Sequence, residues 1–269
     1  MTRHLRWLGP ALVCVWLLLP EMSWAQGLPM VNVSEHGKVR YLHLGTPWVQ
    51  GSMWVKKPYD IELEYVQRMQ AWLLWHDPDQ VAGLHAMQLG LGAATLTKHC
   101  HQVLGMRTTA IELNPQVVAA CRTWFCLPED DERLSVVLGD AAEVVAHHHW
   151  QGQIDVLHVD LYDHEAAAPV LDDPLFYGHC RRLLTTQGCM VVNLFGRNAR
   201  YEQSLAHIQQ AFGKGHVWAF KPTREGNTVV LAQHQPRPEA LAHWHTRAQA
   251  IEARWQLPAP SWVRGLKPA

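Results

Sequence analysis

The chain has 269 residues, of which 48% are apolar and 17% are charged, with 23 Lys and Arg against 24 Asp and Glu. That length and apolar fraction provide a substantial core and exclude a disordered chain, which combines low hydrophobicity with high net charge. The net charge of −1 gives no basic footprint, so nucleic acid is not an expected partner. Six cysteines in this length exclude a small scaffold held together by disulfides.

Residues 1–25 have the pattern of a secretory signal peptide. Two arginines precede a short apolar run, and Ser23 and Ala25 place small side chains at −3 and −1 of a cleavage site after Ala25. The run is too short to cross a bilayer, which needs about 20 apolar residues, so no stable membrane span is predicted. Two interpretations remain open: export, or a start codon assigned upstream of Met30.

Two elements are predicted before residue 84. Alternating side chains over residues 39–55, with a turn at Gly45, predict that residues 30–58 form a small β element. Apolar residues then recur four apart, which predicts a helix over residues 59–75.

From residue 85 onward, short apolar strands alternate with helical stretches. Such alternation predicts an α/β fold, Rossmann-like and doubly wound, with a mostly parallel seven-stranded sheet within a domain of residues 59–235. The last two strands are close in sequence and are expected to form an antiparallel pair, and residues 236–269 are predicted as a terminal helix and tail. The predicted strands cover residues 85–89, 108–113, 134–138, 154–160, 189–194, 216–220 and 228–232.

Chemistry-bearing residues follow the first three strands, where ligands bind in open α/β sheets. Gly90 and Gly92 let the backbone approach a ligand, and Glu112 lies 22 residues beyond Gly90, a spacing that suits hydrogen bonds from ribose hydroxyls. Asp140 ends the third strand, where it can accept a bond from an adenine amino group. Each residue alone has a structural alternative. Glu112 could only interact favourably with the dipole of the helix that follows, and Asp140 could only be a helix N-cap. Together they favour a nucleoside site.

Two carboxylates follow the fourth strand, Asp160 at its tip and Asp163 on the loop beyond. They could bind a cationic substrate and accept a proton from it. An amine with a pKa of about 10 is almost wholly protonated at pH 7, and an ammonium has no lone pair with which to attack. The alternative is that Asp160 only caps the turn after its strand.

At these positions the chain resembles the spermidine synthase family, the polyamine aminopropyltransferases on a class I methyltransferase-like fold. The resemblance covers roughly residues 42–232. It rests on Val49-Gln50-Gly51-Ser52, the Gly90 loop, Ala110-Ile111-Glu112, Leu138-Gly139-Asp140 and Asp160-Leu161-Tyr162-Asp163, with support from Phe176-Tyr177.

The resemblance implies that decarboxylated S-adenosylmethionine is the donor, that Gln50 lies near it, and that Asp160 with Asp163 handle the amine. It also implies a homodimer. Several family positions differ here: Ala93 stands where the family has the aspartate that holds the donor's ammonium, the family's Tyr-His pair falls near Glu64 and Tyr65, and Arg224 replaces a late tyrosine.

The leading hypothesis is therefore a transferase that moves an aminopropyl group from an adenosyl-sulfonium donor to a small-molecule amine. The alternatives are a methyltransferase that uses S-adenosylmethionine and a non-catalytic nucleoside- or polyamine-binding homologue. No metal site is predicted, because the histidine run at residues 147–149 and the scattered cysteines lack a ligand arrangement. The cytoplasm is the expected compartment, since such donors are made there, and periplasmic export is the alternative.

Overall fold

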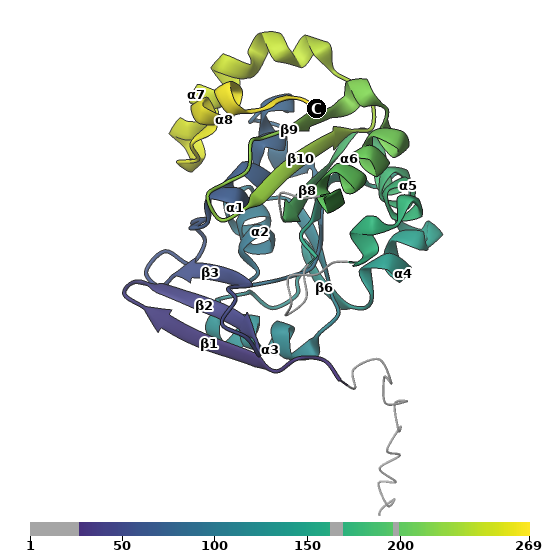
Figure 1. Cartoon of the computed structure of the whole chain (residues 1–269). Coiled ribbons are helices and arrows are strands. Elements are labelled where there is room, and N and C mark those ends of the chain that lie inside the picture. The colour runs from purple at the N-terminus through teal and green to yellow at the C-terminus, as the bar shows by residue number, and fades with distance from the viewer. Residues whose placement is uncertain (1–26, 162–168, 196–198) are drawn as a thin grey trace, which may run out of the picture.

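The structure, a computed structural model, describes residues 27–161, 169–195 and 199–269. Its strands form a large sheet, ordered β11-β9-β10-β8-β7-β4-β5-β6, and a small antiparallel sheet, ordered β1-β2-β3. The strands are β1 (Val31–His36), β2 (Val39–Leu44), β3 (Gly51–Trp54), β4 (His85–Leu89), β5 (Arg107–Glu112), β6 (Leu134–Leu138), β7 (Ile154–Val159), β8 (Leu184–Phe195), β9 (Val217–Ala219), β10 (Asn227–Gln233) and β11 (Lys267–Pro268). The predicted α/β, Rossmann-like fold is confirmed (Figure 1).

The large sheet is parallel from β8 through β7, β4 and β5 to β6, and β10 and β9 join it antiparallel beyond β8. The register pairs Leu89 with Val159 and Val159 with Val192. The residues that follow these strands therefore lie side by side at one edge, which is where a ligand cleft is expected. The sheet has one strand more than the seven predicted, because two residues near the C-terminus pair with β9.

Helices cover both faces of the large sheet. They are α1 (Glu64–Met69), α2 (Thr95–Lys98), α3 (Pro115–Trp124), α4 (Ala141–Ala146), α5 (Pro174–Leu183), α6 (Ala199–Phe212), α7 (Trp244–Trp255) and α8 (Ala259–Gly265). Shorter helical turns are η2 (Ala71–Trp75), η3 (Val81–Gly83), η4 (His99–Val103), η5 (His148–Trp150), η6 (Pro169–Asp172), η7 (Lys214–His216) and η8 (Pro238–His243). Alternate residues of one strand enter different cores: Ala86 packs with α1, α2 and α7, whereas Met87 packs with α4, α5 and α6.

The helix predicted over residues 59–75 begins later than its apolar spacing indicates. It starts at Glu64, since Leu63 is still extended and Glu62 is hydrogen-bonded to Ser52 of β3. Helix α2 begins at Thr95, directly after Ala94, whose left-handed backbone (φ +56°) closes the glycine loop.

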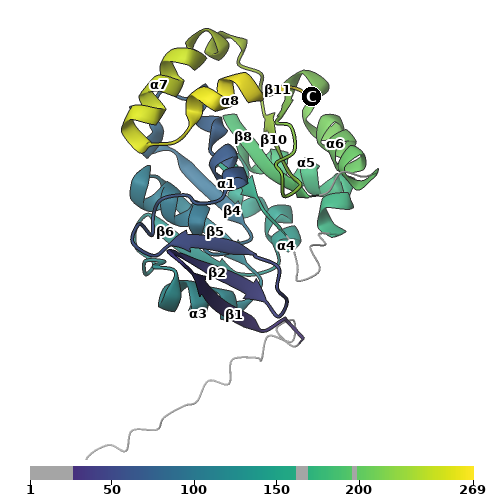
Figure 2. The same ribbon diagram turned by 60° about the vertical axis from the view of Figure 1, so that its left-hand side comes forward.

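The small sheet packs on the glycine loop and α3 through a core of its own. Leu42 and Met53 contact Leu91 and Ala93 of the loop and the buried face of α3, including Val117. Figures 1 and 2 both place this sheet at the end of the molecule opposite α7 and α8. The small sheet therefore lies directly against the glycine loop and α3.

The C-terminal segment, predicted as one helix and a tail, contains α7, then α8, then β11. Trp244 of α7 packs its ring against Trp75 and Trp218, with ring centroids 4.9 and 5.1 Å apart. Such aromatic contacts add to the free energy gained from area burial. In the described part of the chain, no helix is long and apolar enough to cross a membrane.

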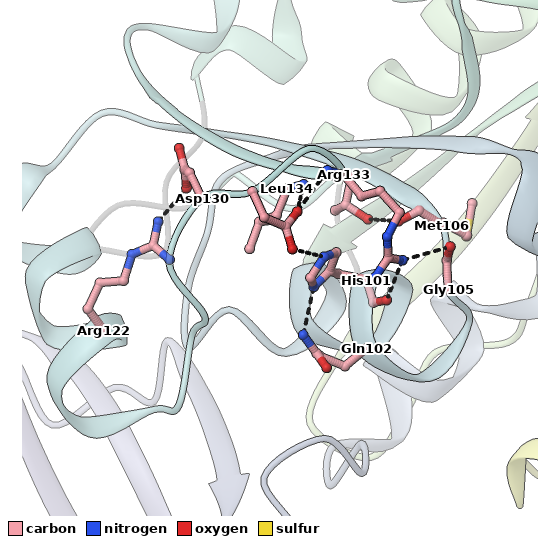
Figure 3. Close-up of polar contacts among 10 residues, drawn as sticks. His101, Gln102, Gly105, Met106, Arg122, Asp130, Arg133 and Leu134 are labelled. Atoms are coloured by element: carbon pink, nitrogen blue, oxygen red, sulfur yellow. Dashed lines mark hydrogen bonds and ion pairs between the residues drawn. The ribbon is translucent and has the colours of Figure 1, made fainter.

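A polar network ties η4 to the loop before β6 (Figure 3). Arg133 donates to the carbonyl of Gly105 at 2.9 Å, and Gln102 Nε2 donates to His101 Nδ1 at 2.9 Å. His101 Nε2 faces the carboxylate of Asp131 at 3.2 Å. The network lies at the amino ends of the parallel strands, the edge of the sheet opposite their carboxyl ends.

Five histidines are buried among the residues that the structure describes. One, His101, faces Asp131, and the other four are His76, His85, His99 and His158. Burial, which penalises the charged ring, lowers the pKa of His76 and of His158 to about 3 and the pKa of His85 and of His99 to about 4. These side chains are neutral in the folded protein at pH 6, whereas in the unfolded chain they take up protons below pH 6.5.

We therefore expect the free energy of unfolding to fall as the pH drops below about 6.5, because the unfolded state then binds more protons than the native state. Each of the four histidines His76, His85, His99 and His158 contributes a loss of about 1 kcal/mol between pH 7.5 and 5.5, so urea denaturation should show a loss on the order of 4 kcal/mol. Equal stability at the two pH values would contradict this account.

Candidate functional site

A cleft of about 790 Å³ lies at the carboxyl edge of the parallel strands, between the large sheet and the small one. Six of the seven residues predicted from the sequence line it: Gln50, Gly90, Gly92, Glu112, Asp140 and Asp160. The seventh, Asp163, lies outside the described residues. Side chains that are far apart in the sequence therefore share one hollow.

The glycine loop between β4 and α2 is held by very close backbone contacts. Gly90 has a φ of +83°, and a Cβ placed there would lie 2.3 Å from the carbonyl oxygen of Asp160. A Cβ on Gly51 would lie 2.6 Å from the amide nitrogen of Ala93, and one on Gly92 would lie 3.0 Å from the carbonyl of Gln50. The loop therefore lies directly between β3 and the end of β7.

Glu112, at the end of β5, is fixed by backbone donors. One carboxylate oxygen accepts the N–H of Leu91 at 2.8 Å, and the other accepts the N–H of Asn114 at 2.8 Å. Burial raises the pKa of Glu112, and the backbone hydrogen bonds oppose that rise. Each oxygen keeps a further lone pair with which it can accept a hydrogen bond from a ligand in the cleft.

Asp140 fills the N-cap position of α4, where its carboxylate accepts the N–H of Ala142 at 2.7 Å. This is the alternative interpretation that the sequence left open, and it coexists with a place in the cleft wall. A capping carboxylate has one oxygen free for a second donor, so the two roles are compatible.

Asp160 is held between two neutral donors. Asn193 Nδ2 donates to its Oδ1 at 2.9 Å, and the hydroxyl of Tyr65 donates to its Oδ2 at 3.2 Å. Asn227 in turn donates to the side-chain oxygen of Asn193 at 3.2 Å. Burial raises the pKa of Asp160 to about 6, and the bonds from Asn193 and Tyr65 oppose the rise.

Three further polar residues line the cleft without having been predicted from the sequence: Asn193, Asn227 and Glu62. Asn193 is the one polar side chain in the buried apolar run of β8. A polar residue in such a run was the feature of the sequence that could have identified it as a site residue. Its position follows from the register, since Val192 pairs with Val159, the residue before Asp160.

The charge in the cleft is of one sign. Six carboxylates line it, and no lysine, arginine or histidine does so among the residues that the structure describes. The carboxylates are Glu62, Glu64, Glu112, Asp140, Asp160 and Glu225. Within the same described ranges, no group of three or more His, Cys, Asp or Glu side chains could hold a metal ion. The arrangement favours ligands with positive charge.

Curated relatives give the family. The chain is 31% identical to the polyamine aminopropyltransferase of Chromobacterium violaceum over 246 residues, which cover 90% of this chain and 91% of the relative. It is also 31% identical over 243 residues, 90% of each chain, to the enzyme of the same name from Neisseria meningitidis serogroup B. The chain belongs to the polyamine aminopropyltransferase family. A search of family models found no match.

Solved structures share the fold. A probable spermidine synthase from Corynebacterium glutamicum superposes with a TM-score of 0.69 at 21% identity, covering 87% of this chain and 88% of that one. Human methyltransferase-like protein 13, in complex with SAH, gives 0.64 at 21% identity over 72% and 93%. A spermidine synthase in complex with the transition-state analogue AdoDATO gives 0.56 at 16% identity over 87% and 88%.

We expect Gly90→Ala to destabilise the protein by about 3 kcal/mol or more, because the new Cβ meets backbone in a left-handed conformation that cannot relax locally. Urea denaturation measures the change. Gly83→Ala is the matched control, since nothing lies within 4 Å of its added Cβ, and its effect should stay near about 0.5 kcal/mol. Equal stability of the two variants would show that the loop yields to the added atom.

Proposed function

We propose that this protein transfers an aminopropyl group from decarboxylated S-adenosylmethionine to a small-molecule amine. The observation that carries the proposal is the cleft with six carboxylates and no basic side chain among its described lining residues. Both reactants are cations: the donor carries a sulfonium and an ammonium, and the acceptor carries at least one ammonium. A cleft of this charge attracts both reactants and repels phosphate-bearing cofactors.

The nucleoside end of the donor fits the glycine-loop side of the cleft. Glu112 offers lone pairs to the two ribose hydroxyls, and Asp140 offers one to the adenine amino group. Gln50 and Gly92 bring the small sheet against the same loop, so the donor would lie between β3 and the ends of β4 and β5.

The transfer step forms one bond and breaks another. The acceptor nitrogen attacks the propyl carbon next to the sulfonium, the carbon–sulfur bond breaks, and its electron pair stays on sulfur, which leaves as methylthioadenosine. The acceptor must first lose a proton to expose its lone pair, and Asp160 is placed to take it. With a pKa of about 6, Asp160 is ionised at neutral pH yet more basic than an exposed aspartate.

Methyl transfer from S-adenosylmethionine is the alternative reaction. That donor adds a carboxylate at the end of its chain, and the charged side chains in the described lining of the cleft are all carboxylates. Like charges disfavour this pairing. A non-catalytic homologue would bind the nucleoside without turnover.

The first test supplies each donor with putrescine or a mixed amine pool and identifies the nucleoside product by mass spectrometry. We expect methylthioadenosine from decarboxylated S-adenosylmethionine and no S-adenosylhomocysteine from S-adenosylmethionine. S-adenosylhomocysteine as the main product would replace the proposal with methyl transfer. Nucleoside binding without either product would identify a non-catalytic homologue.

The second test concerns Asp160. Asp160→Asn should lower kcat by about 10²- to 10⁴-fold, the range for loss of a general base, while methylthioadenosine binding by calorimetry stays within about twofold of wild type. A variant with full activity would remove Asp160 from the chemistry.

The pH profile gives a third test. For the wild type, kcat/KM should fall as the pH drops through about 6, because Asp160 then becomes protonated. Tyr65→Phe removes a hydrogen bond that favours the ionised form, so it should raise the pKa of Asp160 and move this acid limb to higher pH. An acid limb that stays in place or moves to lower pH would contradict the assigned role of the hydroxyl.

We further propose the cytoplasm as the compartment. The five cysteines of the described part of the chain are free, and four of them are buried. Free thiols persist in a reducing compartment, where the adenosyl donor is also made.

A further inference from the structure

We propose that Glu62, oriented by Ser52, binds the ammonium at the end of the donor's aminopropyl chain. This assignment rests on the function proposed above and deepens it by naming the group that recognises the decarboxylated donor. Ala93 provides no charge at the glycine loop, so a carboxylate from another segment is needed to bind this ammonium.

The small sheet covers the side chain of Ala93. Its side chain is only 2% exposed, and Gly51 packs so closely on it that a Cβ on Gly51 would lie 2.7 Å from the Cβ of Ala93. The residue after Gly51 is Ser52, whose side chain is buried, at 1% exposed. The carbonyl of Ser52 accepts the hydroxyl of Thr95, which ties β3 to the start of α2.

The hydroxyl of Ser52 donates to Oε2 of Glu62 at 2.7 Å. Glu62 lies on the extended segment before α1 and lines the cleft. Ala93 thus contacts Gly51, and the residue after Gly51 holds Glu62, a carboxylate from a different part of the chain.

A small inner pocket continues from the cleft at this place. Its volume is about 20 Å³, and its lining includes Ser52, Ala93 and Thr95 together with Tyr65 and Asp160 of the main cleft. A space of this size holds one water molecule, and an ammonium group is of similar size. The end of an aminopropyl chain that enters between Glu62 and Asp160 would place its charge at the mouth of this pocket.

Glu62 is also the carboxylate best suited to a cationic ligand, because each of the other carboxylates that line the cleft already has another partner or role. Glu64 is paired with Arg68, and Glu225 is hydrogen-bonded to its own backbone N–H and to the side chain of Thr223. Glu112 and Asp140 are bonded to backbone N–H groups, and Asp160 is needed for the acceptor. Among the described contacts, the hydrogen-bond partner of Glu62 is one neutral hydroxyl. A charge held in a protein cleft with only a neutral partner gains most from a bound cation.

The experiment compares two ligands that differ by the aminopropyl group. Decarboxylated S-adenosylmethionine carries a methyl group and the aminopropyl chain on a positively charged sulfur, whereas methylthioadenosine keeps only the methyl group on a neutral thioether. Calorimetry should show that Glu62→Gln weakens binding of the decarboxylated donor by about 10- to 100-fold, the range for loss of a charged hydrogen bond, and changes methylthioadenosine binding by less than about twofold.

Two further variants sharpen the result. Ser52→Ala keeps the charge but frees the carboxylate, so it should weaken donor binding less than Glu62→Gln does. Asp60→Asn is the matched control: it removes a carboxylate from the same segment that is paired with Lys57 and does not line the cleft, so donor affinity should not change.

The outcomes separate the two proposals. If the wild type and Glu62→Gln bind the donor equally, with methylthioadenosine binding intact, the assignment of Glu62 is overturned and the proposed function stands. If Glu62→Gln loses both ligands equally, Glu62 supports the fold of the cleft and does not recognise the ammonium. If the wild type binds neither ligand, the proposed function itself is overturned, and the assignment with it.

Discussion

The close approach of backbone segments at the glycine loop determines the geometry of the whole site. Gly90 lies against the carbonyl of Asp160, and Gly51 lies against Ala93, at distances that leave no room for a Cβ. These two contacts bring β3, the loop after β4 and the end of β7 together. The cleft is therefore built from three stretches of chain that are joined by main-chain contacts, and its side chains inherit fixed positions.

The strand-end residues were predictable from sequence because a parallel sheet places successive strand ends at one edge. That rule alone brings Glu112, Asp140 and Asp160 into one cleft. The rest depended on information that periodicity does not contain. Asn193 is adjacent to Asp160 because of the pairing register of β7 and β8, which a single sequence does not specify. The apolar spacing before residue 64 fits a helix, yet Glu62 is bound to Ser52 and the segment is extended, so a tertiary contact overrides local preference.

The chain is rich in tryptophan and histidine, with 13 and 18 residues, and the structure explains part of this composition. Three tryptophans from η2, β9 and α7 pack edge to face or tilted, and fasten the C-terminal helices to the sheet. Buried histidines occupy core positions in neutral form, which makes stability depend on pH. Asp160 acts in the opposite sense: its raised pKa favours the native state as the pH falls from neutral toward 4. The acid side of any activity profile thus combines protonation of Asp160 with progressive loss of the fold, and separating them requires measuring stability at the same pH values.

The carboxylates that line the cleft repel one another when no ligand is bound. The hydrogen bonds that hold each of them show how the fold tolerates this repulsion. Glu112 and Asp140 are stabilised by backbone N–H groups, Asp160 by an amide and a phenol, and Glu62 by a serine hydroxyl. All of these donors are neutral, so they orient the negative charges without cancelling them. Arginine partners would have neutralised the site and removed its attraction for a cation. With neutral donors the field is retained, and a ligand with two positive charges gains free energy from carboxylates that are already in position.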